Sequence, residues 1–375
     1  MNRYYCNTCG HTWSSDVRFY ADEVCHEIVD SLIKKTFSYR KIAQELSKNM
    51  RSYISHSTVN NLFLAWAEKH APSIYETSLI CKPSWSGHLQ VDGKHFLVNN
   101  TWVVYLIAVD IYTLDIPMAV FCYDENTTTF RFLIQSLLRL HYPFRSLTTD
   151  LGKGFAKEAQ VLLPGIPHQV CTIHLLRYLD QRVPKRPYKD KEVILRFRSM
   201  AQGVLHAKDS TQFDRRFTEF EIVGVKAAQI HAGCQSIYRT FIKYQDCIKQ
   251  FYLDDNIHNN SNNVECIISH LSGKINQAKK FESFSGAYYT MTLNTLFWRL
   301  HAFTASRYKE RNGKSPLFLA KSQHDVHGNW IDVLLSIKNQ SECIECAEPL
   351  RSPIFISQEG IVNVKDGCLL ECQEH

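Results

Sequence analysis

Hydrophobic positions change their spacing several times between residues 86 and 174. Residues 102–113 form an almost unbroken apolar run, which predicts a central strand covered on both faces of a sheet. Residues 126–141 instead repeat apolar positions every three or four residues, which predicts an amphipathic helix. With the shorter apolar runs, the expected order is β-β-β-α-β-α-β. That order predicts an α/β fold in which helices flank a mixed sheet.

The preceding segment, residues 19–69, has the spacing of helices. Ser38 is the expected N-cap of one helix, and Ser55 or Ser57 that of the next. The expected buried stripe of the second helix is Val59, Leu62 and Trp66. A helix pair of this size is typical of a helix-turn-helix, whose second helix enters the DNA major groove, although a plain helical hairpin has the same pattern. The polar positions expected to contact DNA are Ser57, Asn60 and Asn61.

Composition narrows the class of protein. The chain has 375 residues, 45% of them hydrophobic, and a net charge of +6, which is ordinary for a globular protein and permits a nucleic-acid partner. No apolar run is long enough to predict a membrane span. The 13 cysteines are scattered through a long chain, which favours reduced thiols in an intracellular protein.

Two groups of cysteines have spacings that suit structural zinc. Cys6 and Cys9 form a candidate zinc knuckle, and free thiols are the alternative interpretation. The second candidate group lies near the end of the chain and consists of Cys343, Cys346, Cys368 and Cys372.

Acidic residues mark two of the expected strands. Asp92 lies in the first strand and Asp150 ends the fourth. These strands are neighbours in a sheet of this order, so the two carboxylates are expected to meet at one edge. Strand-end aspartates are common turn formers, so each alone would more often be structural. Asp110, in the long apolar run, is interpreted as a polar neighbour with a smaller chance of binding metal.

A third acid comes from a predicted late helix. Glu265 lies at the edge of an apolar stripe near the start of this helix. The alternative is a capping box, with Asn262 as N-cap and Glu265 three residues later. Other acids that could complete the set are Asp254, Asp255 and Glu282.

Cys171 and His174 have a spacing used by metal ligands, but no second pair follows nearby. They are expected to end the fifth strand, beside the strand that leads to Asp150. Their interpretation is a packing and polar-contact motif near the site, with a buried cysteine and a core histidine as the alternative. The helical stretch that follows is rich in Arg and Lys, which is typical of a solvated face and also suits a phosphate backbone.

Four segments in this order resemble DDE transposases: QVDGKHF, SLTTDLGKGF, QVCTIHLLRYL and NNSNNVECII. The most similar group is the Mutator-like transposases and their prokaryotic insertion-sequence relatives. The resemblance implies an RNase H-like core, interrupted by a helical insertion, with Asp92, Asp150 and Glu265 as catalytic metal ligands. It also implies that Cys171 and His174 belong to a C-x2-H motif near the active site. The expected regions are a zinc knuckle (1–15), a helix-turn-helix (16–72), the first part of the core (86–174), the insertion (175–258), the last core helices (259–310) and a C-terminal region with the cysteine group (311–375).

The function implied by this resemblance is transposition. Two Mg²⁺ or Mn²⁺ ions would serve DNA cutting and transfer of the 3′-hydroxyl strand, with Asp92 shared by both ions. Transposon ends and target DNA would be the partners, and a homodimer or higher oligomer would join two ends. The expected location is intracellular and DNA-associated, in the cytoplasm or nucleoid of a prokaryote. The alternatives are a domesticated, non-cutting DNA-binding protein and a regulatory protein that uses the sheet as a ligand domain.

Overall fold

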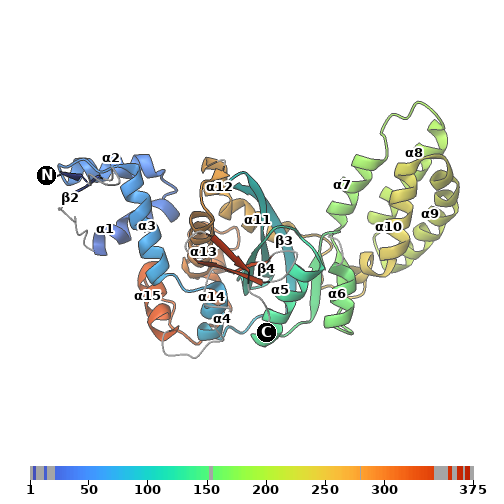
Figure 1. The fold of residues 1–375 in the computed structure, drawn as a ribbon. Helices are drawn as coiled ribbons and strands as arrows, with labels where there is room; N and C mark the ends of the chain where they lie inside the picture. Colours follow the sequence, from blue (N-terminus) through green and yellow to red (C-terminus); the bar gives the residue numbers. More distant parts are fainter. Residues whose placement is uncertain are drawn as a thin grey trace. The chain divides into compact units, whose positions relative to one another are not determined.

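The structure of the chain is a computed structural model (Figure 1). The residues it describes are 3–5, 12–14, 22–151, 155–278, 280–341, 354–356, 361–365 and 368–371. The chain forms two compact units, Met1–His70 and Ala71–His375. No helix within these described ranges combines the length and the apolar character that crossing a bilayer requires.

The first unit is built mainly from three helices. Its elements are β1 (Arg3–Tyr5), β2 (Thr12–Ser14), α1 (Asp22–Ile33), α2 (Tyr39–Asn49) and α3 (His56–His70). Ser38 accepts a hydrogen bond from the backbone N–H of Lys41, which confirms it as the N-cap of α2. Ser55 likewise accepts from the N–H of Thr58 at the start of α3. The predicted stripe of α3 is wrong at one position, because Phe63 is buried while Leu62 is only half-buried.

The second unit contains the predicted mixed sheet. Its five central strands are β3 (His88–Val98), β4 (Thr101–Asp110), β5 (Met118–Cys122), β6 (Ser146–Thr149) and β7 (His168–Val170). They lie in the order β5-β4-β3-β6-β7. β3, β4 and β5 pair antiparallel, whereas β6 pairs parallel with β3 and β7 parallel with β6. The further strands are β8 (Lys280–Phe281) beside β3, and β9 (Ile354–Ile356), β10 (Ile361–Lys365) and β11 (Cys368–Glu371) beyond β5.

Helices cover both faces of this sheet. On β4, Val104 and Leu106 pack with α5 (Thr127–Arg139) and α6 (Phe155–Leu162). The alternate residues Val103, Tyr105 and Ile107 pack on the other face. The helices on that face are α11 (Asn262–Leu271), α12 (Gly273–Ala278) and α13 (Phe284–Leu300). Successive side chains of a strand point to opposite faces, so this arrangement confirms the strand predicted from the unbroken apolar run.

Between β7 and α11 the chain forms a helical insertion with its own core (Figure 1). Its helices are α7 (Thr172–Arg182), α8 (Lys191–Leu205), α9 (Ser210–Ile230), α10 (Ala232–Ile248) and the 3₁₀ turn η1 (Gln250–Tyr252). Phenylalanines dominate this core: Phe197, Phe213, Phe217, Phe220 and Phe241 are all at most 1% exposed. Aromatic side chains bury a large apolar area, which lets four helices hold a core separate from that of the sheet.

Three further helices contact α13, which carries one side of a buried ion pair. They are α4 (Ile74–Cys81), α14 (Pro316–Leu319) and α15 (Trp330–Ser341), and the 3₁₀ turn η2 (Lys309–Arg311) precedes α14. Arg299 on α13 donates to both carboxylate oxygens of Asp115 at 2.8 and 3.0 Å, and both side chains are fully buried. Arg299 also donates to the backbone oxygen of Ile74, and Trp85 donates to Asp115. The pair therefore connects α13, the segment after β4 and the start of α4.

Candidate metal centre

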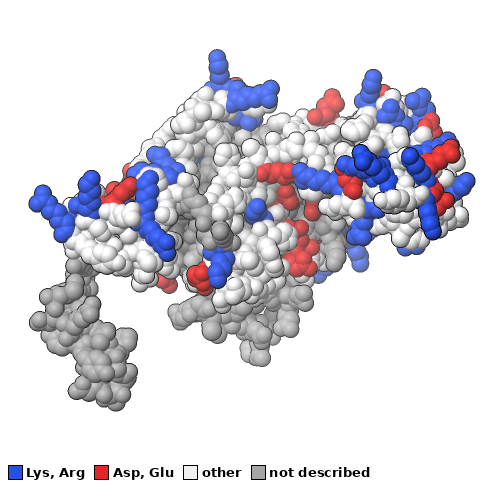
Figure 2. Space-filling model, turned by 90° about the horizontal axis from the view of Figure 1, so that it is seen from above, with Lys and Arg blue, Asp and Glu red and all other residues white. Residues whose placement is uncertain are grey.

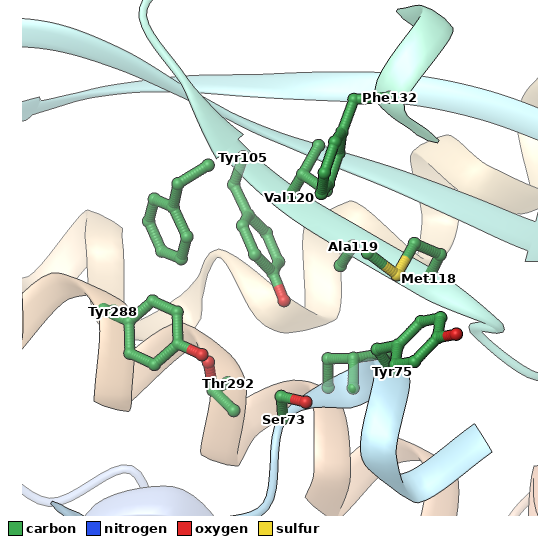
Figure 3. A pocket seen from close by; sticks show the side chains of 11 residues that line it. Ser73, Tyr75, Tyr105, Met118, Ala119, Val120, Phe132, Tyr288 and Thr292 are labelled. Atoms are coloured by element: carbon green, nitrogen blue, oxygen red, sulfur yellow. The ribbon is translucent and has the colours of Figure 1, made fainter. Parts of the chain in front are cut away.

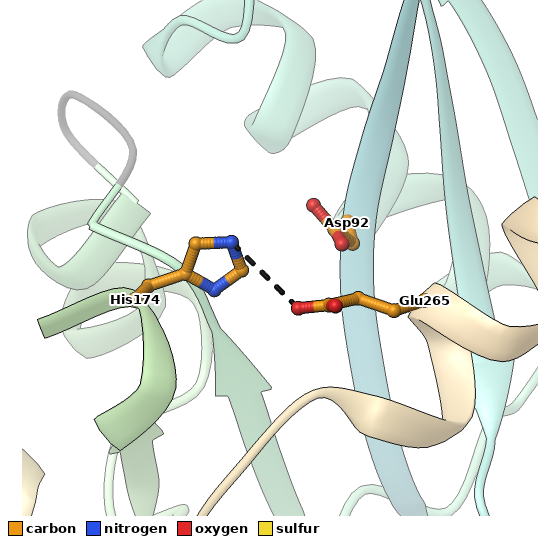
Figure 4. Close-up of side chains that lie close together, drawn as sticks. All are labelled: Asp92, His174 and Glu265. Carbon is orange, nitrogen blue, oxygen red and sulfur yellow. Dashed lines mark ion pairs between the residues drawn. The ribbon is translucent and has the colours of Figure 1, made fainter. Parts of the chain in front are cut away.

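Three elements bring acidic and imidazole groups together in the second unit. Asp92 comes from the middle of β3, Glu265 from the first turn of α11 and His174 from the first turn of α7. One potential ligand atom of each lies within 4.8 Å of the other two. Figure 4 shows His174 and Glu265 pointing towards each other, with Asp92 beside them. The Nε2 atom of His174 is 3.9 Å from an oxygen of Glu265.

The prediction that Cys171 and His174 end the fifth strand is wrong. β7 ends at Val170, and Cys171 is the N-cap residue of α7, which carries His174. The N–H of Cys171 still bonds to Thr149 at the end of β6, but the N–H of Thr172 bonds instead to the oxygen of Asn259. Since β6 ends at Thr149, the chain beyond Cys171 has no strand to pair with there. It continues as helix α7, which directs His174 towards Glu265.

Burial and charge shift the proton equilibria of the site. Burial raises the pKa of Asp92 to about 7, with a further increase from the charge of Asp150, while His174 opposes the shift. The interaction with the Cys171 thiol, helped by Asp92 and Asp150, raises the pKa of His174 to about 9. Burial alone would raise the pKa of Cys171, but interactions with His174 and Ser261 outweigh it and the pKa is lowered. The site therefore favours the protonated forms of Asp92 and His174.

Asp150 lies immediately after β6, the parallel neighbour of β3. Its charge acts on both Asp92 and His174, so it is close to the site. Among the described residues, the group within 4.8 Å consists of Asp92, His174 and Glu265, so the predicted third carboxylate, Asp150, is not part of it, although its charge acts on two members. Glu125, which the sequence analysis did not single out, adds a further negative charge near Asp92 and pairs with His95 at 3.5 Å.

Arg177 is a second residue that the sequence analysis missed. One turn after His174 on α7, its guanidinium donates to both carboxylate oxygens of Glu265, each at 3.2 Å. Its Nη1 atom also lies 3.5 Å from Nε2 of His174. No sequence motif indicates this contact, because Arg177 is one of many basic residues in that stretch and its partner is 88 positions away.

Two direct links join the start of α7 to the start of α11. The backbone N–H and the hydroxyl of Ser261 both approach the sulfur of Cys171, at 3.4 and 3.2 Å. Thr172 donates from its N–H and its hydroxyl to the oxygen of Asn259. The capping box predicted for Asn262 is wrong, because Ser261 is the N-cap residue and makes no side-chain cap bond. The Ser261 hydroxyl instead lies 3.4 Å from Glu265. The start of α11 is therefore held by its contacts with Cys171 and Thr172 at the start of α7.

A buried glutamine connects the same helix to the sheet. Gln90, two residues before Asp92 and 1% exposed, donates from Nε2 to the oxygen of Asn260 at 2.8 Å. Its Oε1 accepts from the N–H of Val264 at 3.4 Å. Gln90 and Asp92 point to the same side of β3 because side chains alternate along a strand. Gln90 therefore sets the position of Glu265 relative to Asp92.

Asp110 has a structural role, contrary to the small chance of metal binding that the sequence suggested. It is fully buried, and its oxygens accept from the backbone N–H groups of Ser86, Gly87 and Thr113. The hydroxyl groups that donate to it are those of Ser86, Thr113 and Tyr142. A carboxylate with this many donors has no free direction for a metal ion.

The other acids weighed from the sequence have different neighbours. Asp254 accepts hydrogen bonds from Asn256, and Glu282 pairs with Lys280 at 3.5 Å. Asp255 is exposed. Of the described acids, Glu265 is the one that joins Asp92 in the metal-sized group.

The zinc predictions lie outside the described residues. Cys6, Cys9, Cys343, Cys346 and Cys372 fall in undescribed segments, and the side chain of Cys368 is not described. The residues predicted to contact DNA do lie on α3. There, Ser57 and Asn61 are exposed and Asn60 is half-buried.

A small apolar pocket lies elsewhere in the second unit (Figure 3). It is lined by residues of α4, β4, β5, α5 and α13, including Tyr75, Tyr105 and Tyr288. Its volume of about 30 Å³ is room for very few water molecules, and its lining has no acidic or histidine side chain. It is a packing defect between layers, and the chemistry-bearing group is the one around Asp92.

The donors of the site suit a divalent cation. Two carboxylates and an imidazole can bind Mn²⁺ or a similar transition metal, while carboxylates alone suit Mg²⁺. Burial is the main cause of the raised pKa of Asp92, and the negative charges of Asp150 and Glu125 add to it. Neither the comparison with family models nor that with curated proteins finds a match to this chain.

Proposed function

We propose that the chain is a DDE transposase, which cuts DNA at the ends of a mobile element and joins the freed 3′-hydroxyl to target DNA. The observation that carries this proposal is the meeting of Asp92 with Glu265, 173 positions apart, at a place where the charge of Asp150 acts on Asp92. Phosphoryl transfer of this kind uses a few carboxylates, fixed by rigid elements, to bind divalent cations.

The sheet supports an RNase H-like assignment of the core. Numbered along the chain, its five central strands have the order 3-2-1-4-5, with the first three antiparallel and the last two parallel. In this arrangement Asp92 and Asp150 come from neighbouring parallel strands. Glu265 returns to them on α11 after the helical insertion, in the place that the transposase resemblance implies.

In the proposed reaction Asp92 would be shared by two Mg²⁺ or Mn²⁺ ions, with Asp150 and Glu265 each holding one. Bound cations of this kind lower the pKa of an attacking water or hydroxyl and stabilise the leaving oxygen. The protein's contribution is positional. β3 fixes Asp92, while Gln90 and Ser261 fix the helix start that carries Glu265. His174 adds a nitrogen on the same side, which would favour Mn²⁺ over Mg²⁺ once the imidazole has lost its proton.

Basic side chains on the insertion support DNA as the partner. Figure 2 shows Lys and Arg spread over these helices, with acidic side chains between them. The exposed members of the basic stretch are Arg177, Arg182, Lys185, Arg186, Lys189, Lys191 and Arg196. Arg198 is different, because it is buried and pairs with Asp180. We propose that the exposed residues contact phosphates, that α3 reads DNA through Ser57, Asn60 and Asn61, and that two copies join two ends.

The test is nicking of a supercoiled plasmid that carries the DNA flanking this gene. Wild-type protein is expected to nick it with Mg²⁺ or Mn²⁺ and to stop when EDTA is added. Asp92→Asn and Glu265→Gln should abolish nicking, and Glu192→Gln, an exposed carboxylate on α8, should leave it unchanged. Equal activity in all four proteins would refute the proposal. Binding of the flanking DNA without any nicking would favour the alternative of a domesticated, non-cutting DNA-binding protein.

A further inference from the structure

We propose that Arg177 is the resident counter-ion of the candidate metal site, and that it must release Glu265 before this carboxylate can bind a divalent cation. The inference rests on the proposed metal site and adds a residue that controls its occupancy. Arg177 would not bind the cation itself. It would act as a gating residue, which controls cation binding through its contact with Glu265.

The contact is specific in its geometry. Two different nitrogens of Arg177 each donate to a different oxygen of Glu265, both at 3.2 Å. This is the paired arrangement in which a planar guanidinium matches a carboxylate. Arg177 also approaches Nε2 of His174, so it faces two of the three side chains in the metal-sized group.

The guanidinium and a divalent cation compete for the same oxygens. A cation binds a carboxylate oxygen at roughly 2.0–2.6 Å, which would place it next to a guanidinium that holds both oxygens of Glu265. Two positive groups at that separation repel each other strongly in a partly buried site. Binding of the cation therefore requires Arg177 to withdraw or shift.

Arg177 is free to do so. Its side chain is 54% exposed, against 29% for Glu265, so the guanidinium can turn into solvent without leaving a buried charge. An ion pair this exposed contributes little to folding stability. A contribution to folding stability therefore does not explain the ion pair. A role of Arg177 as an exchangeable partner of Glu265 does explain it.

Isothermal titration of the full chain with Mn²⁺ tests the proposal. Arg177→Gln removes the competing cation and should tighten Mn²⁺ binding by about threefold or more. Arg177→Lys, which cannot span both oxygens, should fall between this variant and the wild type. Arg215→Gln is the matched control: it removes the same charge from an exposed position on α9 and should leave Mn²⁺ affinity close to that of the wild type.

A variant that merely damages the fold would bind Mn²⁺ more weakly, so a gain in affinity is specific to the gating role. Unchanged or weaker binding by Arg177→Gln, in a protein whose melting temperature matches that of Arg215→Gln, would overturn the proposal. The gain should also vanish when Glu265→Gln is added.

Two further variants separate this failure from failure of the metal site itself. If Asp92→Asn and Glu265→Gln bind Mn²⁺ as the wild type does, the proposed site is wrong and the role of Arg177 falls with it. If both lose binding while Arg177→Gln gains nothing, only the role of Arg177 is refuted.

Discussion

The sulfur of Cys171 lies 3.2 Å from the hydroxyl oxygen of Ser261, 90 positions further along the chain. Cys171 precedes α7, which carries His174, and Ser261 precedes α11, which carries Glu265. One contact between two small buried side chains therefore sets the separation of two groups in the candidate metal centre. It also gives the cysteine of the C-x2-H motif a role that needs no zinc.

Removal of the Ser261 hydroxyl should loosen this link. Ser261→Ala is expected to weaken Mn²⁺ binding by about threefold to tenfold and to lower the free energy of unfolding by about 1 kcal/mol. Calorimetric titration and urea denaturation measure the two effects. Ser136→Ala is the control, since Ser136 is equally buried but its hydroxyl has no hydrogen-bond partner. If both variants bind Mn²⁺ as the wild type does, the link has no role in positioning Glu265.

Two buried glutamines allow a matched comparison. Gln90 holds the start of α11, whereas Gln169 on β7 bonds to Ile248 and Phe251 at the end of the insertion. Replacing either by Leu leaves backbone groups unpaired and should cost about 1–3 kcal/mol in the free energy of unfolding. Only Gln90→Leu should also weaken Mn²⁺ binding. Similar losses of Mn²⁺ affinity in both variants would show that general destabilisation, and not the position of Glu265, is responsible.

The affinity for Mn²⁺ should rise with pH, because protons compete with the cation. The pKa of Asp92 is raised to about 7, so below that value affinity should increase by about tenfold for each pH unit if Asp92 alone loses a proton, and by about a hundredfold if His174 must lose one too. Above it the profile depends on His174, whose pKa is raised to about 9. A ligating imidazole must lose its proton, so continued tightening up to about pH 9 would identify His174 as a ligand, and a plateau above pH 7 would exclude it. Titrations at constant ionic strength measure the profile, and an affinity that falls with pH would contradict the site.

The buried pair of Asp115 and Arg299 should matter for stability alone. Asp115→Ala leaves a fully buried guanidinium without its carboxylate and is expected to cost about 3–5 kcal/mol in the free energy of unfolding. Glu282→Ala, which breaks the pair with Lys280 in which both side chains are exposed, should have a much smaller effect. Urea denaturation compares the two. Equal losses would mean that burial of the Asp115 pair is not what makes it important.

Local patterns predicted the elements that carry the site better than the site itself. The strand around Asp92 and the helix after Asn126 follow from residues close in sequence, since apolar spacing reports which face is buried. The start of α11 was predicted one residue late, because Asn262 and Ser261 are both good capping residues. What distinguishes Ser261 from Asn262 as the first residue is the contact of Ser261 with Cys171, and no local pattern contains that contact.

The partners of the acidic residues were beyond such patterns. Arg177 and Gln90 contact residues 88 and 170 or more positions away, and a basic or amide side chain in a helix or strand has many possible partners. Asp110 is the reverse case, because the sequence favoured a polar-neighbour role and left a smaller chance of metal binding open. From the sequence it resembled Asp92 as an acid in an apolar strand, and only its surrounding donors distinguish a structural carboxylate from a metal ligand.

Two hydrogen bonds from Thr172 to the backbone oxygen of Asn259 join the two ends of the insertion, which are 87 positions apart. The two ends of the insertion meet at one hydrogen-bonded point. Its length can therefore vary without disturbing the sheet from which it extends. Shortening it to a tight reverse turn between these two residues would also remove His174 and Arg177, so the product would show how much cation affinity the carboxylates supply by themselves. The same closure offers a tolerant location for grafting a fluorescent or affinity module near the reactive groups.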